Sequence, residues 1–100
     1  MFIIKKLNHN NFNTNNVTHM CGMLCGCKLL KELNLNNFNT NNVIDMSLMF
    51  RGCSSLKEIT INNFHINNVT KITGMFKGCS DGLHKKIKIK YKNIREEAFY

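Results

Sequence analysis

The sequence predicts an α/β repeat protein, a solenoid with short parallel strands on one face and short helices on the other. Three phenylalanines, Phe12, Phe38 and Phe64, lie 26 residues apart. Other residues recur at the same interval: Val17, Val43 and Val69; Met23, Met49 and Met75; Gly26, Gly52 and Gly78; Cys27, Cys53 and Cys79. A unit of this length cannot bury two apolar stripes alone, so we expect successive copies to stack and share one core.

The first half of each unit is predicted to be a strand. Leu33 and Leu35 alternate with polar residues, and Ile59 and Ile61 do the same one unit later. Alternation with a period of two residues places the apolar side chains on one face of a strand. Equivalent strands are therefore expected to pair in parallel at about 4.8 Å.

The second half of each unit is predicted to be a helix of about three turns. The apolar residues at helical spacing are Val43, Met46, Met49, Phe50 and Cys53. Asn42 is expected to be the N-cap, with Asp45 three residues later in the first turn. Gly52 is expected to end the helix, where a left-handed backbone is needed.

These units predict a single domain over residues 1–92, with repeats at 3–28, 29–54 and 55–82, a partial fourth strand at 83–92, and a C-terminal tail at 93–100. In the fourth strand, Ile87, Ile89 and Tyr91 alternate with lysines. We expect the apolar face to cover the third repeat and the lysines to face solvent. Charged side chains on an edge strand hinder pairing with further chains.

The repeat pattern LxLxNFNTNNVxxMxxMFxGCxxL resembles that of the BspA-like leucine-rich-repeat family, whose unit also has 26 residues. The resemblance covers residues 3 to about 89. It implies a right-handed leucine-rich-repeat-like solenoid with a strand-lined concave face, and adhesion or protein binding rather than catalysis. Members are often surface proteins, but the opening MFIIKKLNHNN lacks the features of a signal peptide, so an intracellular location is expected for this chain.

The outward strand positions form the candidate binding face for another protein, whose identity the sequence does not indicate. They are Lys6, Asn8, Asn10, Glu32, Asn34, Asn36, Glu58, Thr60 and Asn62. The asparagines have a second interpretation, because stacked amide side chains also satisfy the backbone of turns. We favour that interpretation for the turn residues and leave Asn34 open.

Positive charge is concentrated near the C-terminus of a chain whose formal net charge is +8. The alternative function is therefore binding of nucleic acid or another polyanion, because clustered lysines attract phosphate without reading sequence. The candidate patch consists of Lys85, Lys86, Lys88, Lys90 and Lys92. Capping of the last repeat is the interpretation that we favour for these lysines.

Catalysis, cofactors and metals are not expected. Cys27, Cys53 and Cys79 hold one repeat position and should be buried as small apolar residues, whereas Cys21 and Cys25 leave a metal site open as a minor alternative. The six acidic residues stand mostly at varied repeat positions. No apolar run approaches the roughly 18 residues of a membrane span. End-to-end self-association is expected through an uncapped N-terminal repeat.

Overall fold

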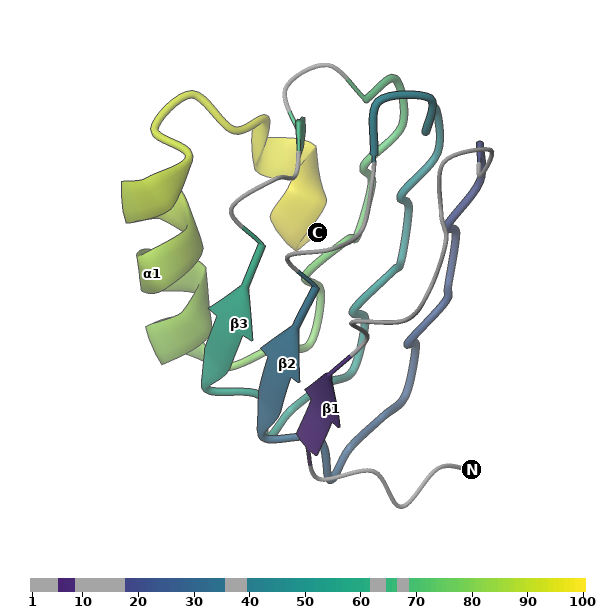
Figure 1. Cartoon of the computed structure of the whole chain (residues 1–100). Helices are drawn as coiled ribbons and strands as arrows, with labels where there is room; N and C mark the ends of the chain where they lie inside the picture. Colours follow the sequence, from purple (N-terminus) through teal and green to yellow (C-terminus); the bar gives the residue numbers. More distant parts are fainter. Residues whose placement is uncertain (1–5, 9–17, 36–39, 62–64, 67–68) are drawn as a thin grey trace.

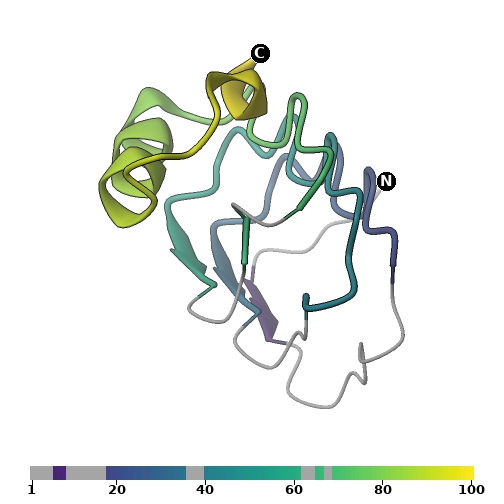
Figure 2. The same ribbon diagram turned by 90° about the horizontal axis from the view of Figure 1, so that it is seen from above.

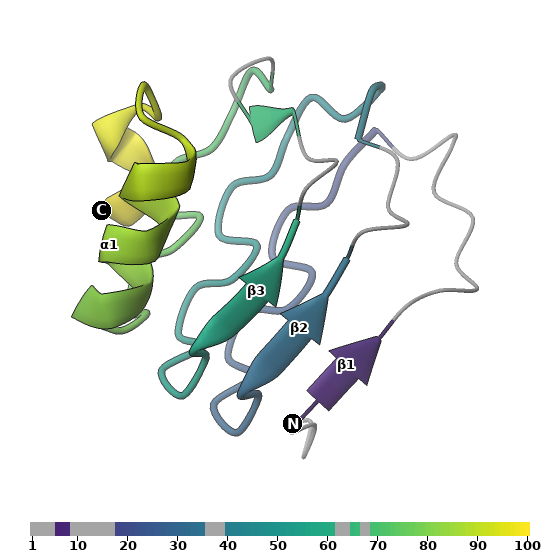
Figure 3. The same cartoon turned by 60° about the vertical axis from the view of Figure 1, so that its left-hand side comes forward.

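The computed structural model describes residues 6–8, 18–35, 40–61, 65–66 and 69–100. Its elements in chain order are β1 (Lys6–Asn8), β2 (Glu32–Asn34), β3 (Glu58–Thr60), the α-helix α1 (Asp81–Lys90) and the 3-10 helix η2 (Glu96–Phe99). The three strands form one parallel sheet in the order β1-β2-β3, and α1 lies beside β3 (Figures 1 and 3). Within the described residues no helix is both long and apolar enough to cross a membrane.

The strands pair at the repeat interval. Leu7 is opposite Leu33, and Leu33 is opposite Ile59, so each partner lies 26 residues further along the chain. Leu33 is 2% exposed, while Glu32 on its N-terminal side is exposed. The alternation in sequence therefore separates a buried from a solvent-facing side in β2. Phe12, Phe38 and Phe64, which share the 26-residue interval, lie outside the described residues.

The prediction of a solenoid with helices opposite the strands is wrong. In the stretch expected to be helical, backbone N–H groups of Met49, Arg51 and Cys53 each donate to a carbonyl three residues earlier, at 3.1 to 3.3 Å. These are successive turns, and Leu48 and Gly52 have φ of 58° and 75°, which an α-helix does not allow. In the described part of the chain the single α-helix is α1, which lies beyond all three stretches predicted to be helical.

Backbone hydrogen bonds instead join three segments side by side, which we call the first row (residues 18–27), the second row (44–53) and the third row (70–79). N–H groups of Met20, Gly22, Leu24 and Gly26 donate to the carbonyls of Asp45, Ser47, Met49 and Arg51 at 2.7 to 2.9 Å. Those of Met46, Leu48, Phe50 and Gly52 donate to Lys71, Thr73, Met75 and Lys77 at 2.8 to 3.1 Å. The rows run next to one another when seen from above (Figure 2). These N–H groups bond to a neighbouring row, which leaves them unable to bond within a helix.

The core lies between the rows and the sheet. Its largest fully buried side chains include Phe50, Phe76, Leu30, Leu35 and Met46. The rings of Phe50 and Phe76 stack with centroids 5.3 Å apart. The prediction that Cys27, Cys53 and Cys79 are buried is confirmed, since all three belong to this core.

The predicted fourth strand is wrong as well, because residues 81–90 form α1. The hydroxyl of Ser80 accepts the N–H of Leu83 at 3.1 Å and caps the helix. Leu83, Ile87 and Tyr91 are four residues apart, so a helix brings them to the same side, and Leu83 and Ile87 are buried. Ile89, which the strand prediction placed with the apolar face, is 74% exposed.

The C-terminal segment is not the tail that the sequence predicts. Ile94, Ala98 and Phe99 are all buried. The Phe99 ring stacks on Phe76 with centroids 5.9 Å apart. Residues 94–100 therefore cover the core next to the third row.

Candidate functional site

The candidate binding face follows the register of the sheet. Lys6, Glu32 and Glu58 stand at equivalent positions of β1, β2 and β3, and so do Asn8, Asn34 and Thr60. Glu32 and Glu58 are exposed, whereas Asn34 and Thr60 are half-buried. The remaining candidates, Asn10, Asn36 and Asn62, lie outside the described residues. The structure thus aligns two sets of equivalent candidate residues across the strands of one small sheet.

Four of the five lysines of the predicted patch lie on α1, which distributes them around the helix axis, and Lys92 follows the end of the helix. Lys85, Lys86, Lys88, Lys90 and Lys92 are all exposed. The Lys86 ammonium lies 2.9 Å from the Glu58 carboxylate and also donates to the Lys57 carbonyl at 3.0 Å. The Lys88 ammonium lies 3.8 Å from Glu96 and 4.8 Å from the centre of the Phe99 ring. Two of the five charges are thereby partly neutralised, and the cluster offers a weaker positive field than the sequence suggests.

A third surface, which the sequence analysis missed, is a shallow groove of about 310 Å³ across the three rows, which we call the basic groove. It is lined by Cys25, Gly26, Lys28, Arg51, Gly52, Lys77 and Gly78. Cys25, Arg51 and Lys77 hold one repeat position, and their equivalence predicts that they line up on the surface. Three cationic side chains and no carboxylate line the groove, so it can attract an anionic group.

The cysteines divide into an exposed and a buried set. Cys21 and Cys25 are exposed, and the described residues hold no group of three His, Cys, Asp or Glu side chains arranged to bind a metal. The thiols of Cys53 and Cys79 donate to the carbonyls of Leu24 and Phe50, each at 3.2 Å. Burial raises the pKa of Cys53 to about 12 and that of Cys79 to about 11. Both thiols therefore stay protonated and act as small apolar donors between rows.

This burial predicts a decline of stability in alkaline solution. A cysteine thiol in the unfolded chain has its ordinary pKa of 9.0. Below pH 9 the thiols are protonated in both states, but above it the unfolded chain releases protons that the folded chain retains, so the free energy of unfolding should fall between pH 9 and 12. The substitution Cys53→Ala should make this fall shallower in urea unfolding curves measured across that range. Cys21→Ala, at an exposed thiol, should leave the slope unchanged, and an equal slope in all three proteins contradicts the prediction.

The fold and the surfaces together define a small protein built on a 26-residue sequence repeat. A family model matches residues 2–97, and the chain belongs to that family, DUF285, described as a Mycoplasma protein of unknown function. No curated protein and no solved structure matches the chain.

Proposed function

We propose that this chain is a non-enzymatic binding module whose repeat is of the BspA-like leucine-rich-repeat kind at the level of sequence. It acts in protein–protein interaction or adhesion through the solvent-facing side of β1, β2 and β3. The observation that carries the proposal is the strand register, which aligns Glu32 with Glu58 and Asn34 with Thr60. Neighbouring strand positions face alternate sides, so polar groups are presented to a partner above a buried layer.

The chemistry of this face favours a protein partner. The exposed carboxylates can form ion pairs with cationic side chains of a partner. The half-buried amide and hydroxyl groups can donate hydrogen bonds to a partner and accept them from it. Leu33 beneath them is 2% exposed, so the backbone that carries them is held by packing. A rigid surface binds with a smaller loss of conformational entropy than a mobile loop.

Polyanion binding is the second candidate function, and the basic groove is the observation that favours it. Lys28, Arg51 and Lys77 line one concavity without an acidic neighbour in it. The lysines of α1 are the other candidate, although Lys86 and Lys88 are engaged with carboxylates. The two basic surfaces can be separated by experiment because they share no residue.

Two sets of variants of the full chain test the two functions. Protein binding is measured by immobilising the chain and quantifying by mass spectrometry the proteins that it captures from a lysate of the source cell. Polyanion binding is measured as the salt concentration that elutes the chain from heparin. We expect Glu32→Lys to lower specific protein capture at least about five-fold, equal to about 1 kcal/mol, because a reversed charge at an interface is repulsive. Glu96→Lys makes the same change of charge on η2 and is the matched control.

The heparin arm compares two double variants of equal charge change. If polyanion binding is the function, Arg51→Glu with Lys77→Glu should elute at lower salt than Lys85→Glu with Lys92→Glu, since removing the groove charges removes an unneutralised cluster. Protein capture that is identical for Glu32→Lys and Glu96→Lys contradicts the strand-face proposal. Elution of the unmodified chain at low ionic strength contradicts the polyanion proposal.

A further inference from the structure

The first and third rows present opposite hydrogen-bonding groups at their outer edges. From Met20 in the first row and Met46 in the second, the earlier row donates its N–H groups and the later row accepts them at its carbonyls. At the start of the rows the direction is reversed, since Ile44 donates to the Thr18 carbonyl at 2.8 Å and Lys71 donates to the Ile44 carbonyl at 3.0 Å. Repetition of that pattern makes the outer edge of the first row an edge of acceptors. They are the carbonyls of His19, Cys21, Met23 and Cys25, which correspond to those of Asp45, Ser47, Met49 and Arg51 one unit later. The outer edge of the third row is correspondingly an edge of donors.

The acceptor edge of the first row is open within the described part of the chain. No N–H group there donates to the carbonyls of Cys21, Met23 or Cys25. The side chains of these three residues are also exposed, with Met23 at 36%. A line of unpaired backbone carbonyls with exposed side chains beside it is a template for pairing with another chain.

The donor edge of the third row is covered by the C-terminal segment. The N–H of Gly74 donates to the Glu97 carbonyl at 2.8 Å, and that of Phe76 donates to the Ala98 carbonyl at 2.7 Å. Phe99 stacks on Phe76 much as Phe76 stacks on Phe50. Residues 94–100, which we call the cap, therefore supply the two central acceptors and the ring that a further row would supply.

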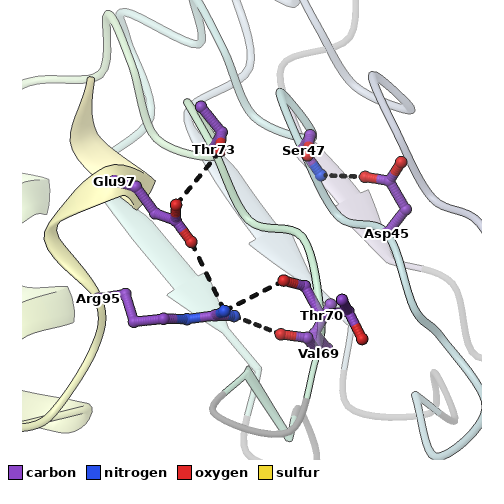
Figure 4. Close-up of polar contacts among 7 residues, drawn as sticks. All are labelled: Asp45, Ser47, Val69, Thr70, Thr73, Arg95 and Glu97. Carbon is purple, nitrogen blue, oxygen red and sulfur yellow. Dashed lines mark hydrogen bonds and ion pairs between the residues drawn. The ribbon is translucent and has the colours of Figure 1, made fainter.

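Polar contacts hold the cap on the third row (Figure 4). The Arg95 guanidinium donates to the carbonyls of Val69 and Thr70, the latter at 3.1 Å. The Glu97 carboxylate lies 3.5 Å from Arg95 and accepts the Thr73 hydroxyl, also at 3.5 Å. All four contacts are exposed or partly buried, so they are weaker than the apolar packing of Phe99 and can be released separately.

We infer that the cap prevents head-to-tail association, and that the first row binds the third row of a second copy of this chain when that copy's cap is displaced. Two first rows cannot pair with each other, because both offer acceptors. A capped third row has its two central donors occupied by Glu97 and Ala98, so a capped chain does not offer a complete donor edge to another first row. Head-to-tail pairing repeats the contact between successive rows, and because it is heterologous each added copy leaves an edge for the next, so the oligomers grow beyond a dimer. This inference is independent of the proposed function, since it involves neither the strand face nor the basic groove.

The test compares the full chain with one that ends at Asn93, both in reducing solution, by sedimentation velocity over a wide range of concentration. The full chain should remain a monomer, whereas the mass of the shortened chain should rise with concentration beyond that of a dimer. Full chain added to the shortened chain should reduce the oligomers, because each full chain binds through its first row and offers no free donor edge in return.

A second pair of variants identifies the surface. In the shortened chain, Cys21→Glu with Met23→Glu places two charges on the acceptor edge and should restore the monomer. Leu29→Glu with Ile44→Glu makes the same change at exposed apolar residues away from that edge and should leave association intact. A shortened chain that is folded, as judged by circular dichroism, and monomeric overturns the inference. The inference is also overturned if the two double variants associate to the same extent.

Loss of the cap exposes Phe76, so the shortened chain can fail to fold. The full chain with Arg95→Ala then takes its place, because it loses the contacts to Val69 and Thr70 but keeps Phe99. The Arg95→Ala chain should associate, although more weakly than the shortened chain, and adding Cys21→Glu with Met23→Glu should again abolish the association. A monomer at every concentration, in a folded Arg95→Ala chain, overturns the inference.

Discussion

Phe76→Ala is expected to lower the free energy of unfolding by about 3–5 kcal/mol, the usual cost of truncating a buried aromatic ring. Phe76 is fully buried, and its ring stacks on Phe50 on one side and on Phe99 on the other. The substitution leaves a cavity between the second row, the third row and the cap at once. Urea unfolding followed by circular dichroism measures the change.

Tyr100→Ala is the control for this prediction, because Tyr100 is an aromatic residue that is 71% exposed. It should change the free energy of unfolding by less than about 0.5 kcal/mol, as surface substitutions usually do. A loss of similar size at both positions would mean that the stacked rings do not organise the core. A domain of this size has only about 5–15 kcal/mol of stability, so the loss at Phe76 should be easy to detect.

Gly78→Ala is expected to destabilise the chain by about 1–3 kcal/mol, since a non-glycine residue in left-handed backbone is strained. Gly78 has φ of 80°, and an added Cβ would lie 3.2 Å from the Gly52 nitrogen and 3.3 Å from its Cα. The neighbour is backbone, which cannot rotate away as a side chain can. The close approach of the second and third rows therefore depends on this glycine.

Gly82→Ala supplies a matched substitution with the opposite sign. Gly82 lies in α1, and the nearest atom to its added Cβ is the Ser80 hydroxyl oxygen at 3.9 Å. Alanine is the better helix former, so we expect a gain of about 0.5–1 kcal/mol. Both variants are measured by the same urea unfolding curves. Equal effects at Gly78 and Gly82 would show that the strain and the close approach do not control stability.

The alignment of the candidate binding residues and the burial of the cysteines were accessible from sequence because both depend on the repeat interval. Equivalent residues, such as Leu33 and Ile59, face each other across the sheet at that interval. The basic groove was accessible in principle, since Cys25, Arg51 and Lys77 share a repeat position. Its concave shape was not, because Lys28 joins the groove from outside that position.

The C-terminal helix was misread because two periodicities overlap in one segment. Ile87, Ile89 and Tyr91 alternate as in a strand, while Leu83, Ile87 and Tyr91 follow at intervals of four as in a helix. The deciding signal was Ser80 before Asp81, an N-cap followed by an acidic residue in the first turn. A strand would have buried Ile89, whereas the helix leaves it exposed.

By itself the sequence determined the 26-residue spacing and which residues are apolar, and from these follow the strand register and the buried cysteines. Only the tertiary structure decided that the second halves of the repeats form turns and that residues 94–100 cover the third row. The physical reason is competition for backbone hydrogen bonds. An N–H group such as that of Phe50 can donate within its own segment or to the next row, and the apolar pattern along one segment is compatible with both. The outcome depends on whether a neighbouring row offers its carbonyls, which is a property of the assembled chain.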